Sequence, residues 1–386
     1  MRTTDFDYRL PEAAIAQTAI EPRDHSRLLD VRLDRDRRFA DLPDMLEPGD
    51  LLVVNRTRVR AARLQGRRLD SGGAVEALLL RRLVPAGGGS EDTEGEATDW
   101  EATDWEALVR PARRLRPGIR IAFGPRTDDG PTGEEPTAEV LPGEILTDPV
   151  DGLVTLRLTG SAQDVEQAVA AHGAVPLPPY FHGALADPER YQTMFASTVG
   201  SAAAPTAGLH FTPALVARLT DAGIGIAEVE LDVGLDTFRP MTVDEVGDHV
   251  IHRERFRIPE ATAVAHRRTR RSGGRIVAVG TTVVRTLETA GNPDGTIEPG
   301  EGESSLFITP GYRFGAIDAM ITNFHAPRTT LIALVAAAIG PQWRRVYESA
   351  LQRDYRFLSF GDAMFISALG DPGDAPDSGA PYGVRL

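Results

Sequence analysis

The chain has 386 residues, and its 42 basic residues stand against 56 acidic ones, for a formal charge of -14. Apolar residues at 41% and charged residues at 25% are ordinary for a globular protein, which excludes a wholly disordered or fibrous chain. All basic residues are arginine, and there is no cysteine. Lysine Schiff bases, P-loop lysines, disulfides, thiolate metal sites and cysteine nucleophiles are therefore excluded.

The chain begins with the charged stretch MRTTDFDYRL, which has no apolar segment of a signal peptide. No apolar run approaches the roughly 18 residues that cross a membrane. We therefore expect a cytoplasmic protein with no membrane partner. The apolar stretch DLLVVN, residues 50–55, is the first predicted strand of an α/β domain that comprises residues 1–61 and 158–369.

Residues 62–157 predict an inserted domain of another kind. Short apolar stretches such as AVEALLL and LVTLRLTG alternate with Gly and Pro turns, which is typical of a small antiparallel β-barrel. Within it, residues 86–106 combine Gly, Ser and acidic residues with a tandem EATDW duplication. We expect this segment to be a disordered acidic loop, with Trp100 and Trp105 duplicated in a tolerant surface position.

From residue 158 the chain alternates helical and strand patterns. Ser161 and Thr212 are predicted N-caps of helices that end at Gly173 and Gly223. The alternation predicts a layered α/β domain with a largely parallel sheet. The further predicted elements are strand 226–233, helix 260–271, strands 275–280, 305–310 and 318–324, helices 330–340 and 343–353, and a flexible tail over 370–386.

Polar residues follow several of the predicted strands, where α/β proteins build their sites. Thr281 and Thr282 stand between a strand and a helix in VGTTVVRTLE. This arrangement suits either an anion at the helix start or an ordinary helix cap. Asn323 and His325 lie between a strand and a helix in NFHAPRTT, where two polar residues favour a functional role.

Two other histidine motifs admit a structural interpretation. His249 and His252 have a spacing that could place two metal ligands on one helical face. No HExxH pattern or cluster of carboxylates supports them, so we predict no metal site. His210 lies among apolar neighbours just before a predicted helix cap, as a satisfied buried histidine would.

Several long motifs together resemble one family, the S-adenosylmethionine:tRNA ribosyltransferase-isomerases. They are TDFDYRLPEAAIAQ, LLVVNRTRVRAARL, APTAGLHFT, HVIHRE, VGTTVVRTLE and TNFHAPRTTL, and the resemblance covers most of the chain. It implies an α/β domain with an inserted β-barrel. It also implies transfer of the ribosyl unit of S-adenosylmethionine to 7-aminomethyl-7-deazaguanine at the tRNA wobble position, giving epoxyqueuosine, adenine and methionine. The implied partners are S-adenosylmethionine and tRNA, with no other cofactor, and we expect a monomer.

The implied reaction needs a base beside the sulfonium and an acid for the departing adenine. Because lysine and cysteine are absent, we expect His210 and His325 to transfer protons, with Asp362 as the alternative. The sequence does not assign which of them is the base.

The substrate also needs counter-groups. Arg239 or Arg285, with the helix start at Thr281 and Thr282, is expected to hold the methionine carboxylate. The other residues expected to contact substrate are Asn55, Arg58, Thr206, Asp232, His249, His252 and Asn323.

One motif departs from the family. Where members usually have LHVGAGTFRP, this chain has LDVGLDTFRP, so Asp232 replaces a histidine and Asp236 is a second added carboxylate. Asp232 could neutralise the sulfonium, or the two carboxylates could rebuild the pocket. The alternative function is therefore a paralogue that uses the same donor chemistry on a small molecule or a different base. A third interpretation, an RNA-binding protein without catalysis, is disfavoured by the motif histidines.

The negative charge is local. Residues 86–150 hold 15 acids and 6 arginines, so -9 of the -14 lies there and the rest of the chain carries -5. A tRNA partner is therefore not excluded by charge. Arginines at 267, 268, 270 and 271, with Arg344 and Arg345, predict a face for tRNA, although a solvated helix face is the alternative.

Overall fold

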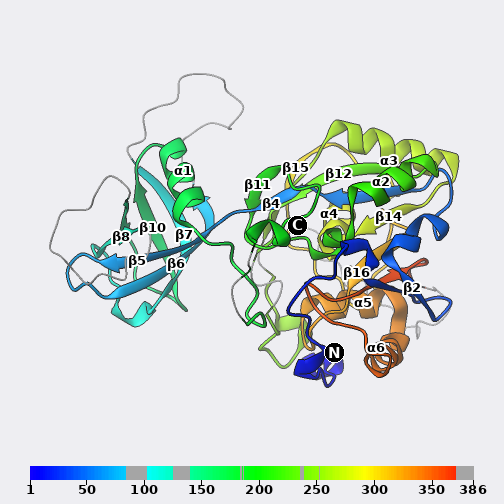
Figure 1. Cartoon of the computed structure of the whole chain (residues 1–386), viewed down its shortest axis with the longest axis horizontal. Helices are drawn as coiled ribbons and strands as arrows, with labels where there is room; N and C mark the ends of the chain where they lie inside the picture. The colour runs from blue at the N-terminus through cyan, green and yellow to red at the C-terminus, as the bar shows by residue number, and fades with distance from the viewer. Residues whose placement is uncertain are drawn as a thin grey trace. The chain divides into compact units, whose positions relative to one another are not determined.

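A computed structural model describes residues 1–83, 102–124, 140–182, 185, 187–234, 239–251 and 253–370. The chain divides into two compact units, drawn in Figure 1. The α/β unit comprises Met1–Val59 and Pro178–Leu386, and the barrel unit comprises Arg60–Leu177. Within the described ranges, no helix is long and apolar enough to cross a membrane.

The α/β unit is built on a nine-stranded sheet with the order β15-β13-β12-β3-β14-β16-β17-β1-β2. Its strands are β1 (Arg27–Asp30), β2 (Arg35–Arg38), β3 (Leu51–Asn55), β12 (Gly225–Leu231), β13 (Glu254–Ile258), β14 (Ile276–Val279), β15 (Gly300–Ser304), β16 (Ala319–Asn323) and β17 (Ala363–Ile366). The central strands β12, β3, β14 and β16 are parallel.

The α/β class is confirmed, but the sheet is mixed rather than largely parallel. β13 and β15 pair antiparallel on one side of the parallel centre, and β17 pairs antiparallel with β16 on the other. β1 and β2 form an antiparallel hairpin at the far edge. Helices over Thr330–Ile339 and Trp343–Gln352 separate β16 from β17, yet these two strands pair antiparallel, whereas β17 and β1 pair in parallel. Strand–helix alternation therefore does not by itself fix the direction of the flanking strands.

Side chains of the central strands alternate between two apolar layers, as the period of a strand requires. On β14, Ile276 and Ala278 enter the layer with α3, α4 and α5, while Val277 and Val279 enter the layer with α2. The helices are α2 (Pro213–Asp221), α3 (Glu260–Ser272), α4 (Thr281–Thr289), α5 (Thr330–Ile339) and α6 (Trp343–Gln352).

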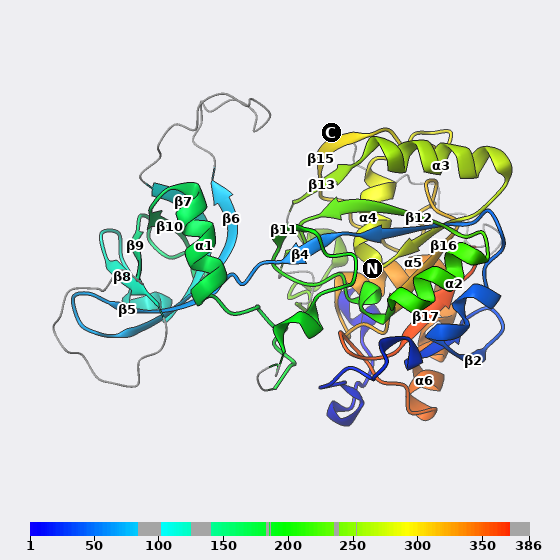
Figure 2. The same ribbon diagram turned by 45° about the horizontal axis from the view of Figure 1, so that its top comes forward.

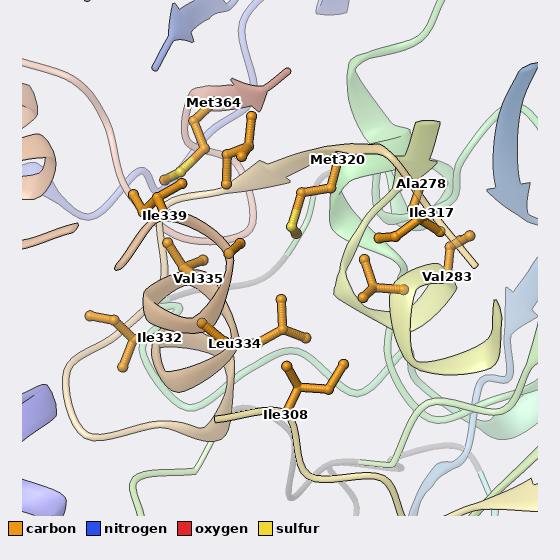
Figure 3. Close-up of a cluster of buried hydrophobic side chains, with 14 of the residues drawn as sticks. Ala278, Val283, Ile308, Ile317, Met320, Ile332, Leu334, Val335, Ile339 and Met364 are labelled. Atoms are coloured by element: carbon orange, nitrogen blue, oxygen red, sulfur yellow. The ribbon is translucent and has the colours of Figure 1, made fainter. Parts of the chain in front are cut away.

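The larger layer is centred on α5. Figure 3 shows Val335 and Ile339 of this helix facing Met320 of β16 and Met364 of β17. Every residue from Leu331 to Ile339 is buried, which is the pattern of a helix enclosed on all sides. The sheet and helices therefore fix the backbone around the end of β16 rigidly.

The predicted helix ends are confirmed at their caps. Thr212 accepts a hydrogen bond from the backbone N–H of Leu215, and α3 ends at Gly273 in the left-handed conformation, with φ +78°. The strand predicted over 305–310 is wrong. β15 ends at Ser304, and residues 305–310 form no strand although Ile308 is buried, so a short apolar stretch there imitates a strand in the sequence.

The barrel unit contains the predicted antiparallel barrel, closed in the order β10-β7-β6-β5-β8-β9. Its strands are β5 (Arg63–Arg68), β6 (Ala74–Leu83), β7 (Ala102–Arg110), β8 (Arg120–Phe123), β9 (Leu141–Ile145) and β10 (Leu153–Thr159). Helix α1 (Ala162–His172), with Ser161 as its N-cap, lies against the barrel in Figures 1 and 2. Arg63 and Ala174 exchange two backbone hydrogen bonds, which tie the segment after α1 to the barrel. The barrel unit therefore extends to Leu177, beyond the domain boundary expected at residue 157.

The loop expected over 86–106 is wrong at its end, because β7 begins at Ala102. Trp105 is only 1% exposed, and its Nε1 donates to Thr103 Oγ1 at 3.0 Å. The second EATDW copy thus supplies an alternating strand with its tryptophan in the barrel core. Residues 84–101, including Trp100, and the tail from residue 371 lie outside the described residues.

Candidate active site

The carboxyl ends of the parallel strands β12, β3, β14 and β16 meet at one edge of the sheet. Open α/β sheets bind ligands at this edge. Asn55 ends β3, Asp232 follows β12, Thr281 follows β14 across Gly280, and Asn323 ends β16. The topology therefore gathers residues that the sequence separates widely.

His210 lies at the centre of a chain of hydrogen bonds. Its Nδ1 is 2.7 Å from Ser26 Oγ, and its Nε2 is 3.2 Å from Asn323 Nδ2. Thr206 Oγ1 donates to Asn323 Oδ1 at 3.1 Å, from the short helix η7 (Thr206–His210). Phe39 stacks on the imidazole with ring centroids 4.8 Å apart. The fold thus brings together three residues that the sequence predicts for the site, Thr206, His210 and Asn323.

The hydrogen bonds assign a tautomer to His210. Asn323 Nδ2 also faces the carbonyl oxygen of Leu358 at 3.2 Å, and only a donor fits there. The amide therefore donates to His210 Nε2, and the ring proton sits on Nδ1, from which it is donated to Ser26. Burial lowers the pKa of His210 to about 4, despite the opposing effect of Asp362. The imidazole is neutral at neutral pH.

His325 is the second buried histidine of the site. Its Nε2 is 2.8 Å from Thr322 Oγ1, and burial lowers its pKa to about 3. Two tyrosines hold its backbone: Tyr8 donates to the carbonyl oxygen at 2.5 Å, and Tyr347 accepts from the N–H at 3.2 Å. The ring is therefore fixed in position and neutral at neutral pH.

Two hollows border these histidines. The first is lined by Tyr180, Thr206, Asn323, Phe324, His325, Ala326, Thr329, Leu331, Leu358 and Ser359. The second is lined by Ala19, Ile20, Arg23, Ser26, Arg190, Leu209, His210, Arg356, Ser359, Phe360 and Gly361. Ser359 lines both hollows. Asn323 lines the first and His210 lines the second, and a hydrogen bond joins these two side chains.

Asp362 lies close to His210 but is occupied. Its carboxylate accepts backbone N–H groups of Arg27 at 3.0 Å and Arg356 at 2.8 Å, and it pairs with the Arg356 guanidinium at 3.2 Å. The residue is 1% exposed. Both carboxylate oxygens are therefore occupied by hydrogen bonds within the fold.

The start of α4 offers groups for an anion. Gly280 has φ +94°, a conformation that favours glycine, and lets the chain turn from β14 into the helix. The first N–H groups of a helix have no partner within it. Thr281 and Thr282 are buried there, and Thr282 Oγ1 has no hydrogen-bond partner in the described part of the chain.

Arg285 follows one turn later on α4. Its guanidinium pairs with Glu254 at 2.5 Å and donates to the Leu306 carbonyl at 3.2 Å. Within the described ranges its Nη2 has no hydrogen-bond partner, although the side chain is only 8% exposed. Since Glu254 also accepts the N–H of Gly234 at 3.0 Å, this pair connects α4 to the LDVGLDTFRP motif.

Asn55 and Asp232 lie at the ends of β3 and β12. Asn55 donates to the carbonyl oxygen of Leu231 and accepts its N–H, so it binds the two strands to each other. Asp232 is half-buried beside Gly200, where a Cβ would lie 2.3 Å from Asp232 Oδ1. Only glycine therefore fits beside this carboxylate as it stands.

The remaining predicted residues lie apart from the histidines. Arg58 pairs with Glu189, Arg239 is exposed, and the His249 ring meets the edge of Phe307 with centroids 5.8 Å apart. His252 lies outside the described residues. In the part of the chain that the structure describes, no three His, Cys, Asp or Glu residues form a group that could hold a metal ion.

Sequence inspection missed several partners of the site. Ser26, Thr322 and Glu254 contact His210, His325 and Arg285 through single polar atoms. Thr322 adjoins a motif already singled out, whereas nothing in the sequence around Ser26 or Glu254 marks them.

Comparisons with known proteins find one family that is similar to this chain. Residues 3–366 match the family model described as "Queuosine biosynthesis protein". Proteins named S-adenosylmethionine:tRNA ribosyltransferase-isomerase are similar to the chain. The one from Gloeobacter violaceus is 47% identical over 94% of this chain and 95% of its own, and the one from Symbiobacterium thermophilum is 46% identical over 95% and 100%. The crystal structure of S-adenosylmethionine tRNA ribosyltransferase from Thermotoga maritima is 34% identical, with a TM-score of 0.47, over 94% of this chain and 99% of that one.

Proposed function

The chain belongs to the S-adenosylmethionine:tRNA ribosyltransferase-isomerase family, and we propose that His325 is the main proton-transfer group of its reaction. The enzyme transfers the ribosyl unit of S-adenosylmethionine to 7-aminomethyl-7-deazaguanine in tRNA and isomerises it, giving epoxyqueuosine, adenine and methionine. The paralogue alternative loses its basis, because 45–47% identity over 94–95% of the chain joins it to proteins named for tRNA.

The reaction first requires a base. The positive sulfonium acidifies the adjacent C–H, and an unprotonated group must take that proton. His325 meets this need by its place, because it borders the first hollow and is held there through its backbone and through Thr322. The fixed histidine at the edge of that hollow is the observation that carries the proposal.

His210 is the second proton-transfer candidate, and its geometry favours a positioning role. Both ring nitrogens are hydrogen-bonded, and the Nε2 lone pair orients the amide of Asn323 toward the first hollow. Asn323 and Thr206 would then hold the nucleoside by hydrogen bonds. Asp362 is less suited to proton transfer, because it is buried and both of its carboxylate oxygens already accept hydrogen bonds from backbone N–H groups and Arg356.

The methionine carboxylate would bind at the start of α4. The Thr282 hydroxyl and the Nη2 of Arg285 are donors without partners among the described residues. The first N–H groups of a helix also have no partner within the helix. Arg285 is thus favoured over the exposed Arg239 for this role. Asp232, half-buried at the end of β12, is the acidic group we assign to the positive sulfonium or ammonium.

The remaining substrate contacts are assigned to Asn55, Arg58, Thr281, His249 and His252. The acceptor is the deazaguanine-bearing tRNA, and no cofactor beyond S-adenosylmethionine is proposed. We further propose that the enzyme acts as a cytoplasmic monomer.

Adenine release tests the assignment of His325. Purified enzyme is incubated with S-adenosylmethionine and tRNA bearing 7-aminomethyl-7-deazaguanine, and adenine is quantified by chromatography. His325→Ala should slow release by roughly 10²–10⁴-fold, the usual contribution of a general base. His210→Ala should slow it less and also raise the KM for the donor, because Asn323 loses its orientation.

His182→Ala is the matched control, since this histidine is exposed and faces Glu12 rather than either hollow. Its adenine release should equal that of the parent. Calorimetric titration with S-adenosylmethionine shows whether His325→Ala still binds the donor. Full adenine release by His325→Ala would overturn the assignment.

A further inference from the structure

The connection between β7 and β8 carries an unusual density of positive charge. It reads RPARRLRPGIR over residues 110–120, and its five arginines are all exposed. Arg116 is the one with a carboxylate nearby, Asp148 at 3.9 Å. Within the described ranges the other four, at positions 110, 113, 114 and 120, lie within 4.0 Å of no carboxylate. These four form what we call the barrel arginine patch.

The backbone beneath the barrel arginine patch is held in place. Leu115 is fully buried between two exposed arginines, and the short helix η5 spans Ala112–Arg114. Gly118 donates its N–H to Ile145 of β9 at 2.8 Å, which ties the connection to the barrel. The guanidinium groups therefore extend from a fixed segment and lose less entropy on binding than those of a mobile loop.

The arginines expected to face tRNA on α3 are arranged differently. Arg267 pairs with Glu260 and Glu298, and Arg270 pairs with Asp318 at 2.6 Å. Arg344 donates to backbone carbonyl groups of the N-terminal segment. Much of that face is thus engaged within the fold. The arginines of the barrel patch make no ion pair within 4.0 Å among the described residues, although Arg110 and Arg120 lie opposite Glu76 and Glu144 in the strand register.

Charge in the barrel unit is also divided unevenly. Its described residues hold 12 arginines against nine acids, although the whole chain carries -14. The segments 84–101 and 125–139 hold 11 acids and one arginine. The described part of the barrel unit is therefore net positive, and the arginine-rich connection contributes five of its arginines.

We propose that the barrel arginine patch binds the phosphate backbone of the substrate tRNA. The inference rests on the proposed function, which supplies a polyanionic substrate. Guanidinium groups bind phosphate oxygens bidentately, and a rigid row of them suits a row of phosphates. The site contributes affinity and orientation for the acceptor, and it takes no part in the bond changes.

Binding of tRNA by two charge-removing variants tests the inference. The variants are Arg113→Gln with Arg114→Gln, and the quadruple variant that adds Arg110→Gln and Arg120→Gln. Fluorescence anisotropy with labelled precursor tRNA gives Kd over a series of KCl concentrations. Each lost phosphate contact should reduce the slope of log Kd against log salt by about 0.7–0.9. The double variant should weaken binding roughly 10-fold or more at low salt.

Arg157→Gln is the matched control. This arginine lies on the same barrel but pairs with Asp104 through Nε at 2.7 Å and Nη2 at 2.9 Å. Its Kd and salt slope should stay near those of the parent. The patch variants should keep the parent's affinity for S-adenosylmethionine and its kcat at saturating tRNA, while their KM for tRNA rises.

The two proposals fail in distinguishable ways. If the quadruple variant binds tRNA with the parent's Kd and salt slope, the barrel arginine patch is not a tRNA site, whatever the parent's turnover. If the patch variants bind tRNA weakly but the parent releases no adenine with any tRNA, the proposed function fails instead.

Discussion

Burial of His210 and His325 makes folding of the α/β unit sensitive to acid. Their pKa values are lowered to about 4 and about 3, whereas an unfolded histidine titrates near 6.5. Between these limits the unfolded chain binds more protons than the folded one. Stability is therefore retained above pH 6.5 and falls as the pH drops below it, by up to about 1.4 kcal/mol per pH unit for each histidine.

His325→Gln tests this sensitivity, because the amide can still reach Thr322 but does not titrate. The free energy of unfolding in urea is measured from pH 8 to pH 4.5. Below pH 6 the variant should lose less stability per pH unit than the parent, by up to about 1.4 kcal/mol. Above pH 7 the two curves should run parallel, and parallel curves throughout would contradict the buried, neutral state of His325.

The residues proposed for the site were easier to single out in the sequence than their hydrogen-bond partners. His210, Asn323 and His325 stand out because polar groups between apolar elements are rare. Ser26 and Glu254 do not, since a serine and a glutamate are ordinary anywhere in a chain. Ser26 meets His210 across 184 positions of sequence, and only the folded sheet sets that contact.

At the scale of elements, the N-cap of α2 joins local and tertiary structure. Thr212 Oγ1 accepts from Leu215 N–H at 3.1 Å and donates to the buried Asp24 at 2.7 Å. Thr212→Ala should destabilise the α/β unit by roughly 1–2 kcal/mol, the cost of a lost cap. The urea midpoint should fall with an unchanged m-value. Thr212→Ser keeps the hydroxyl and should stay close to the parent; equal midpoints for the two variants would show that the cap is unimportant.

Elements with strong local signals were predicted well and those set by pairing were not. Helix α3 lies between Pro259 and a left-handed Gly273, and both residues are visible in the sequence. β15 has the sequence GEGES, which has no strand propensity, and it forms because β13 offers an open edge. Gly302 fits there because Phe256 occupies the space a Cβ would need.

At the scale of the molecule, the barrel unit is one continuous insertion, Arg60–Leu177, in a domain whose sheet uses strands from both flanks. A change in composition reveals the insertion in the sequence. Its C-terminal boundary is not evident there, because the sequence pattern of α1 resembles that of the helices in the following α/β domain. The backbone pairing of Arg63 with Ala174 closes the unit near its two ends. A closed barrel without free edges and with its own buried core meets the requirements of an independent domain.

The fragment 60–177 should therefore fold alone. Trp105 reports on this, because it is buried in the barrel with Arg60 4.9 Å from its ring centre. In a fragment carrying Trp100→Phe, Trp105 is the remaining tryptophan, and its emission should be blue-shifted and move to the red in one cooperative thermal transition. A fragment that starts at Leu64 and ends at Gly173 lacks the closing pair and should melt at a lower temperature. Red-shifted emission of the longer fragment before heating would mean that the barrel needs the α/β unit to fold.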